Sequence, residues 1–158
     1  MKLYLMSSLT LMIVLIPGCV FDSETAPPPT DEELTKVFTD NKDAFVEIYA
    51  KMIKNGYRTI SLDPEWSDPE ITFNAKKPYH DFLRNINAHR IAKSGDTLWI
   101  CVWSVGLGGD GDYKGYIYQP DGTGQIVESL DNFSPRGEAV LLLRVIGDGW
   151  YLYYDHVP

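Results

Sequence analysis

The feature that most constrains this chain is a mostly apolar run close to its N-terminus. Lys2 precedes the run, which extends from Leu3 to Ile16 and is followed by Pro17 and Gly18. A basic start, an apolar region of about 7–15 residues and a small residue at the cleavage point are typical of a secretory signal peptide. A membrane-spanning helix is the alternative, but it needs about 20 apolar residues, and this run stops early. The pattern therefore predicts a signal peptide over residues 1–18.

A cysteine stands directly after the small residue, and Leu15-Ile16-Pro17-Gly18-Cys19 resembles the lipobox of bacterial lipoproteins. In that family the cysteine carries acyl chains, palmitate among them, and becomes the new N-terminus after cleavage. The resemblance implies a covalent lipid on Cys19 and a membrane anchor in the cell envelope. In enteric members of the family an aspartate after the cysteine favours the inner membrane. Val20 therefore implies the outer membrane, with the protein facing the periplasm.

The composition of the remaining 140 residues indicates one acidic domain. The leader holds one of the 14 basic residues and none of the 22 acidic ones, so the chain after it has a net charge of −9. Nucleic acid is not expected as a partner, because phosphate contacts need lysine and arginine. The charge suits a basic protein partner or simply solubility. Residues 19–29 end in Ala26-Pro27-Pro28-Pro29 and predict an extended tether, which leaves 30–158 as the single domain.

The first part of the domain has helical patterning. Thr30 and Glu33 form a capping-box pattern that predicts a helix start. An apolar stripe then continues to Ile53, with a kink or a second start expected at Asn41 and a stop at Asn55-Gly56. Further along, a strand is expected over 57–62, a loop over 63–77 and a short helix with Pro78 near its first turn.

From Arg90 onward the pattern favours strands and tight turns. Asp148-Gly149 between two apolar and aromatic runs is a strong hairpin signal. Helices followed by strands predict an α+β fold with the N-terminal helices packed on one face of an antiparallel sheet of about four to six strands. The expected strands are 90–93, 98–105, 114–119, 139–146 and 150–155, with 126–130 as a short helix or strand.

Tyrosines alternate along two of the expected strands. Tyr116 and Tyr118 share one face of their strand, while Tyr151 and Tyr153 lie opposite Trp150 on theirs. These four tyrosines are the candidate binding surface if the helices cover only one side of the sheet; core packing is the equal alternative. Core positions are favoured for Trp99, Trp103 and Trp150.

The glycine-rich segment 106–112 has no phosphate-loop lysine and no helix after it. Asp110 and Asp112 are candidate calcium ligands, but two carboxylates fall short of the six to eight oxygens that calcium takes, and a hairpin loop explains the glycines more simply. Cys101 has no second cysteine to pair with once Cys19 is acylated, and its apolar neighbours predict burial. The sequence holds no HExxH or Gly-x-Ser-x-Gly motif, so neither an enzyme nor any cofactor beyond the lipid is expected.

A second resemblance rests on Lys114-Gly115-Tyr116-Ile117-Tyr118 and Gly149-Trp150-Tyr151-Leu152-Tyr153-Tyr154. These segments look like those of small, poorly characterised lipoproteins of Gram-negative bacteria, some of which resemble immunity proteins. The resemblance implies a non-enzymatic, protein-binding role. A small-molecule or lipid pocket, with hydrolysis as one use of it, and a structural envelope role stay open as alternatives.

Overall fold

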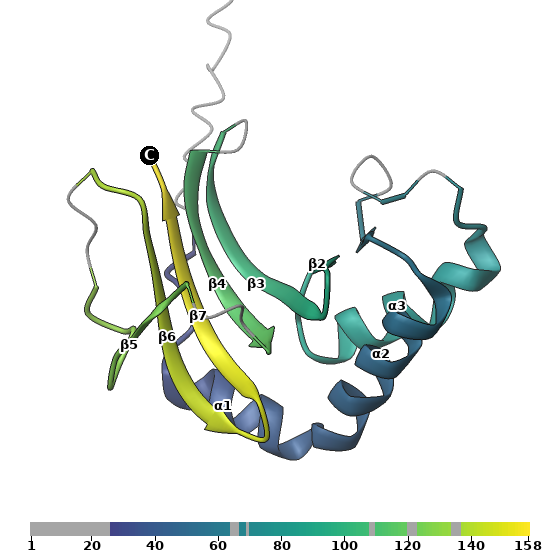
Figure 1. Ribbon diagram of the computed structural model, residues 1–158, viewed down its shortest axis with the longest axis horizontal. Coiled ribbons are helices and arrows are strands. Elements are labelled where there is room, and N and C mark those ends of the chain that lie inside the picture. The colour runs from purple at the N-terminus through teal and green to yellow at the C-terminus, as the bar shows by residue number, and fades with distance from the viewer. Residues whose placement is uncertain (1–25, 64–66, 69, 108–109, 120–122, 134–136) are drawn as a thin grey trace, which may run out of the picture.

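The computed structural model of this chain describes residues 26–63, 67–68, 70–107, 110–119, 123–133 and 137–158 (Figure 1). The predicted signal peptide, Cys19 and the first part of the tether lie outside the described residues. Among those described, no helix combines the length and the hydropathy needed to cross a bilayer. The elements are α1 (Asp31–Asp40), α2 (Lys42–Asn55), β1 (Thr59–Ser61), α3 (Phe73–Asn85), β2 (Arg90–Ser94), β3 (Thr97–Leu107), β4 (Asp110–Tyr118), β5 (Gln125–Ile126), β6 (Val140–Gly147) and β7 (Trp150–Val157).

Within the described residues the strands form one seven-stranded sheet in the order β1-β2-β3-β4-β7-β6-β5. All neighbours are antiparallel except β5, which runs parallel to β6. The predicted mixture of helices and a mostly antiparallel sheet is observed, with more strands than the four to six expected. The strand expected over 57–62 is observed as β1, which has three residues. The segment 126–130, expected as a short helix or strand, overlaps the two-residue edge strand β5.

The helix boundaries predicted for the N-terminal part are confirmed. The Thr30 backbone N–H donates to the Glu33 carboxylate at 2.7 Å, and the Thr30 hydroxyl accepts from the Glu33 N–H, which completes the capping box. Asn41 separates α1 from α2, as expected from the break in the apolar stripe. Gly56 closes α2 with φ +68°, a left-handed conformation that glycine adopts without a Cβ penalty.

The prediction for α3 was wrong at its start. The helix begins at Phe73, inside the segment expected to be a loop, and Pro78 lies within it rather than in its first turn. Thr72 caps the helix by accepting a hydrogen bond from the Ala75 N–H at 3.4 Å. Because proline has no N–H, the carbonyl of Asn74 loses its usual helical partner. The cap and the packing of Tyr79, Phe82 and Leu83 outweigh that loss.

Side chains of all three helices share one core with alternate residues of the sheet. Phe45 of α2 contacts Tyr116 of β4 and Trp150 of β7 edge to face, with ring centroids 4.8 and 5.2 Å apart. The Tyr116 hydroxyl donates to the Leu34 carbonyl of α1 at 3.0 Å. The helices gather near one end of the curved strands, and β3, β4, β6 and β7 extend beyond them (Figure 1).

A buried ionic cluster joins α1 to the sheet. The Lys114 ammonium on β4 is 1% exposed and lies 2.9 Å from Asp31 Oδ1 and 2.8 Å from Asp131 Oδ1. Asp31 Oδ2 accepts from the Leu130 N–H at 2.7 Å, with Arg144 Nη1 3.4 Å away. Burial opposes ionisation of Asp131, but the hydrogen bond and charge of Lys114 and the Asp31 N–H together lower the pKa of its carboxyl.

Gly115 of β4 lies close to the backbone of β3. The register shifts between Cys101 and Trp103, and a Cβ placed on Gly115 would lie 2.0 Å from the Ile100 carbonyl oxygen. Because backbone cannot move aside as a side chain can, we expect Gly115→Ala to lower the free energy of unfolding by about 1–3 kcal/mol or more. Urea denaturation of the two proteins measures the change.

The matched control is Gly95→Asn in the β2–β3 turn. Gly95 has φ +58° and nothing within 4 Å of its ideal Cβ, and asparagine tolerates this conformation. This variant should unfold close to the parent. Equal stability of Gly115→Ala and the parent would contradict the close backbone approach.

Candidate binding site on the second face of the sheet

The sheet has a second apolar cluster on the face opposite the helix contacts. At its centre Ile117, Leu143 and Tyr153 are buried, with 0%, 1% and 3% of their surfaces exposed. Their side chains alternate with those that meet the helices, as strand geometry requires. Partly buried residues surround this centre, and we call the whole set the open-face cluster; the surrounding members are Trp99, Tyr113, Leu141 and Tyr151.

The four candidate tyrosines do not form one surface, which corrects that prediction. Tyr116 is fully buried in the helix-side core, and Tyr118 packs there against Tyr49 with ring centroids 4.3 Å apart. Tyr151 and Tyr153 belong to the open-face cluster on the other side. The cause is register: Tyr116 pairs with Leu152 and Tyr118 with Trp150, so these four residues share a face.

The three tryptophans predicted to lie in the core occupy different environments. Trp150 is 2% exposed in the main core, as expected. Trp103 is partly buried against the same core, and its indole N–H donates to the Ala26 carbonyl of the tether at 2.7 Å. Trp99 lies on the second face, where its ring contacts Tyr153 edge to face at 5.0 Å.

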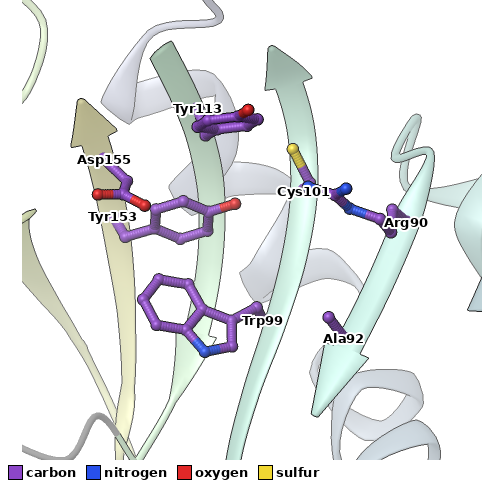
Figure 2. A pocket seen from close by; sticks show the side chains of 7 residues that line it. All are labelled: Arg90, Ala92, Trp99, Cys101, Tyr113, Tyr153 and Asp155. Atoms are coloured by element: carbon purple, nitrogen blue, oxygen red, sulfur yellow. The ribbon is translucent and has the colours of Figure 1, made fainter. Parts of the chain in front are cut away.

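A pocket of about 240 Å³ opens within the open-face cluster (Figure 2). Cys101, Gly115 and Tyr153 are register neighbours on β3, β4 and β7. Because glycine has no side chain, the Cys101 and Tyr153 side chains interact with each other across the middle strand. Figure 2 shows Arg90 and Asp155 on opposite sides of these two residues, on β2 and β7. The lining residues are Arg90, Ala92, Trp99, Cys101, Tyr113, Tyr153 and Asp155.

The pocket holds two opposite charges that do not pair with each other. The Arg90 guanidinium carbon lies 6.0 Å from the centroid of the Tyr113 ring, at the outer limit of a cation–π contact. Asp155 is partly buried, and this burial raises the pKa of its carboxyl. Burial also raises the pKa of Tyr153 well above the usual value, so its hydroxyl stays protonated at neutral pH. The pocket therefore offers a cation, a carboxyl and aromatic walls.

The predicted burial of Cys101 is confirmed: the free thiol is 2% exposed. Burial raises its pKa, and the sulfur hydrogen-bonds to the Trp103 carbonyl at 3.4 Å. A thiol with a raised pKa is a poor nucleophile. Cys101 therefore forms part of the pocket floor rather than a reactive centre.

Gly106 and Gly111 of the glycine-rich segment lie in the β3–β4 hairpin. Gly106 and Gly111 pair across the two strands with φ of +137° and +148°, and a Cβ on either would clash with backbone. Asp112 meets His156, with 2.8 Å between Oδ1 and Nδ1, and Asp110 is exposed at the start of β4. Within the described part of the chain no three His, Cys, Asp or Glu residues are placed to hold a metal ion.

Sequence reasoning missed both charged residues of the pocket. Arg90 and Asp155 were seen only as ends of strands, and nothing local relates residues 65 positions apart. One signal was present in the sequence. Alternation along each strand sets Cys101, Tyr113 and Tyr153 on the same face of the sheet, once the order of the strands is known. That order depends on pairing β4 with β7, which the sequence does not specify locally.

Comparison of the chain with protein-family models, with curated proteins and with solved structures finds no match.

Proposed function

We propose that this chain is a lipid-anchored protein of the bacterial envelope, held in the outer membrane and facing the periplasm, whose open-face cluster binds another protein. The lipobox-like segment ending at Cys19 motivates the anchor. The role is non-enzymatic, and the immunity-type resemblance is compatible with it. The partner is a protein with a basic surface, because the chain after the leader has a net charge of −9.

The observation that carries the binding role is the apolar character of a sheet face that lies opposite the helix contacts. Tyrosine and tryptophan are among the residue types enriched at the centres of protein interfaces. The cluster combines buried anchors with partly exposed neighbours, and Val145 of β6 beside it is 57% exposed. Val145 pairs with Tyr151, so the exposed apolar surface continues from β7 to β6.

Site-specific photocrosslinking tests this role. A photoreactive phenylalanine analogue replaces Val145 in the full chain. The protein is made in a Gram-negative host, and crosslinking is carried out in the intact envelope of that host. We expect one discrete crosslinked species, because a defined interface presents the same partner each time. Mass spectrometry of that species identifies the partner.

Val46 of α2 provides the matched control. It is also a valine, it is 55% exposed, and it lies on a helix rather than on the open sheet face. The probe at Val46 should not give the same species. Identical products from both positions, or no product from Val145 in intact envelopes, would contradict a binding role for this face.

A further inference from the structure

We propose that the pocket on the open face binds a small zwitterion whose carboxylate and ammonium groups are separated by an apolar segment. The carboxylate meets Arg90, the ammonium meets Asp155, and the apolar segment lies against Trp99 and Tyr153 (Figure 2). This inference does not depend on the protein-binding role and can stand or fall without it.

Both charged side chains of the pocket are without a counter-ion in the part of the chain that the structure describes. Among the described residues, neither Arg90 nor Asp155 forms an ion pair, although Asp155 is partly buried. Leaving a partly buried charge unpaired is unfavourable. The two residues come from β2 and β7, with β3 and β4 between them, which places their backbones roughly 14 Å apart. That separation keeps them from neutralising each other and leaves each available to a ligand.

The walls of the pocket are largely aromatic. Trp99 and Tyr153 pack edge to face at 5.0 Å and present an apolar surface, with Tyr153 between the two charges and Trp99 to one side of them (Figure 2). Aromatic faces also attract an ammonium group, which adds to the attraction of Asp155. The Tyr153 hydroxyl, protonated at neutral pH, adds a hydrogen-bonding group.

The pocket is small. A volume of about 240 Å³ corresponds to roughly eight water molecules and is below the ~300 Å³ at which sites for drug-sized ligands begin. The ligand is therefore small, of the size of an amino acid. A singly charged molecule of this size would leave either Arg90 or Asp155 without a partner in the occupied pocket.

Isothermal titration of the full chain in detergent micelles tests the proposal, with titrations into empty micelles subtracted. The probes are the ω-amino acids 4-aminobutanoate, 6-aminohexanoate and 8-aminooctanoate. Each is compared with the carboxylate and the amine of the same chain length. We expect one zwitterion to bind about tenfold or more tightly than both of its singly charged analogues, because each lost charge-assisted contact costs about a factor of ten.

Two variants assign the ends of the ligand. In Asp155→Asn the zwitterion should bind no more tightly than the carboxylate analogue, because the partner of its ammonium group is gone. In Arg90→Gln the zwitterion should bind no more tightly than the amine analogue, because the partner of its carboxylate is gone. The matched controls are Asp40→Asn and Arg84→Gln, both on exposed helix surfaces. Thermal unfolding and circular dichroism verify that every variant is folded.

Three results would overturn the proposal in a folded protein. One is no heat of binding with any zwitterion up to about 10 mM, a concentration that detects even millimolar affinity. Another is equal affinity for a zwitterion and its singly charged analogues. The third is unchanged selectivity in both pocket variants. Crosslinking from Val145 is a separate measurement, so failure of the pocket is distinguishable from failure of the protein-binding role.

Discussion

Replacing Lys114 with methionine is expected to lower the free energy of unfolding by about 3–5 kcal/mol, since removing one partner of a buried ion pair leaves the other charge uncompensated. Methionine fills a similar volume, so the change removes the ammonium without opening a large cavity. Among the described residues Asp31, itself 2% exposed, would keep only Arg144 at 3.4 Å as a counter-ion and would still face Asp131. Urea denaturation at neutral pH measures the loss.

The control is the same substitution at Lys36. Lys36 forms an ion pair with Asp40 on the outer side of α1, where the two side chains are 73% and 55% exposed. Exposed helix pairs contribute about 0.5 kcal/mol or less, so Lys36→Met should unfold close to the parent. Comparable losses in the two variants, or an unchanged stability of Lys114→Met, would contradict the buried cluster as a specific stabilising contact.

Local features of this fold could be predicted from the sequence because each depends on neighbours within four residues. The Thr30 capping box, the break at Asn41 and the stop at Gly56 are interactions between residues close in the chain. The β6–β7 hairpin also forms where Asp148-Gly149 indicates, with φ +56° at Asp148 and +80° at Gly149. In each case the backbone conformation follows directly from the residue type.

What could not be predicted depends on contacts between distant residues. Lys114 stands in an aromatic strand, and the alternation placed it on the same side as Tyr116, yet its partners Asp31 and Asp131 are 83 and 17 positions away. A lysine on a core-facing position was a signal that a buried carboxylate must exist, but not which one. The same limit applies to the pocket, because only the strand order brings Arg90 and Asp155 to the lining of one pocket.

The tyrosine prediction failed for a related reason. The alternation within each strand was read correctly, because Tyr116 and Tyr118 share a face and so do Tyr151 and Tyr153. The missing information was the register between β4 and β7, which sets Tyr116 opposite Leu152. A shift of one residue exchanges the two faces of a strand. Sequence alternation therefore identified two pairs of tyrosines but not the side of the sheet that each pair occupies.

Replacing Cys19 with serine is expected to move the protein from the membrane fraction to the soluble fraction, which is the largest change anticipated for any variant of this chain. A serine cannot form the thioether that carries the lipid. Each buried methylene group of an acyl chain contributes about 0.8 kcal/mol to membrane binding, and stable anchoring takes more than one chain. Fractionation of cells and mass spectrometry of the N-terminal peptide measure the change.

Cys101 supplies the matched control, because it is the second of the two cysteines in the chain. It is 2% exposed within the folded domain, so a lipid cannot be accommodated on it without unfolding. Cys101→Ala should therefore remain in the membrane fraction and keep its acylated N-terminal peptide, with only the modest loss of stability that a smaller buried side chain brings. Membrane association that survives Cys19→Ser but requires Cys101, or an unmodified thiol at Cys19 in the parent protein, would contradict the proposed anchor. Because each variant changes one sulfur atom, the comparison separates the role of the lipid from that of the fold.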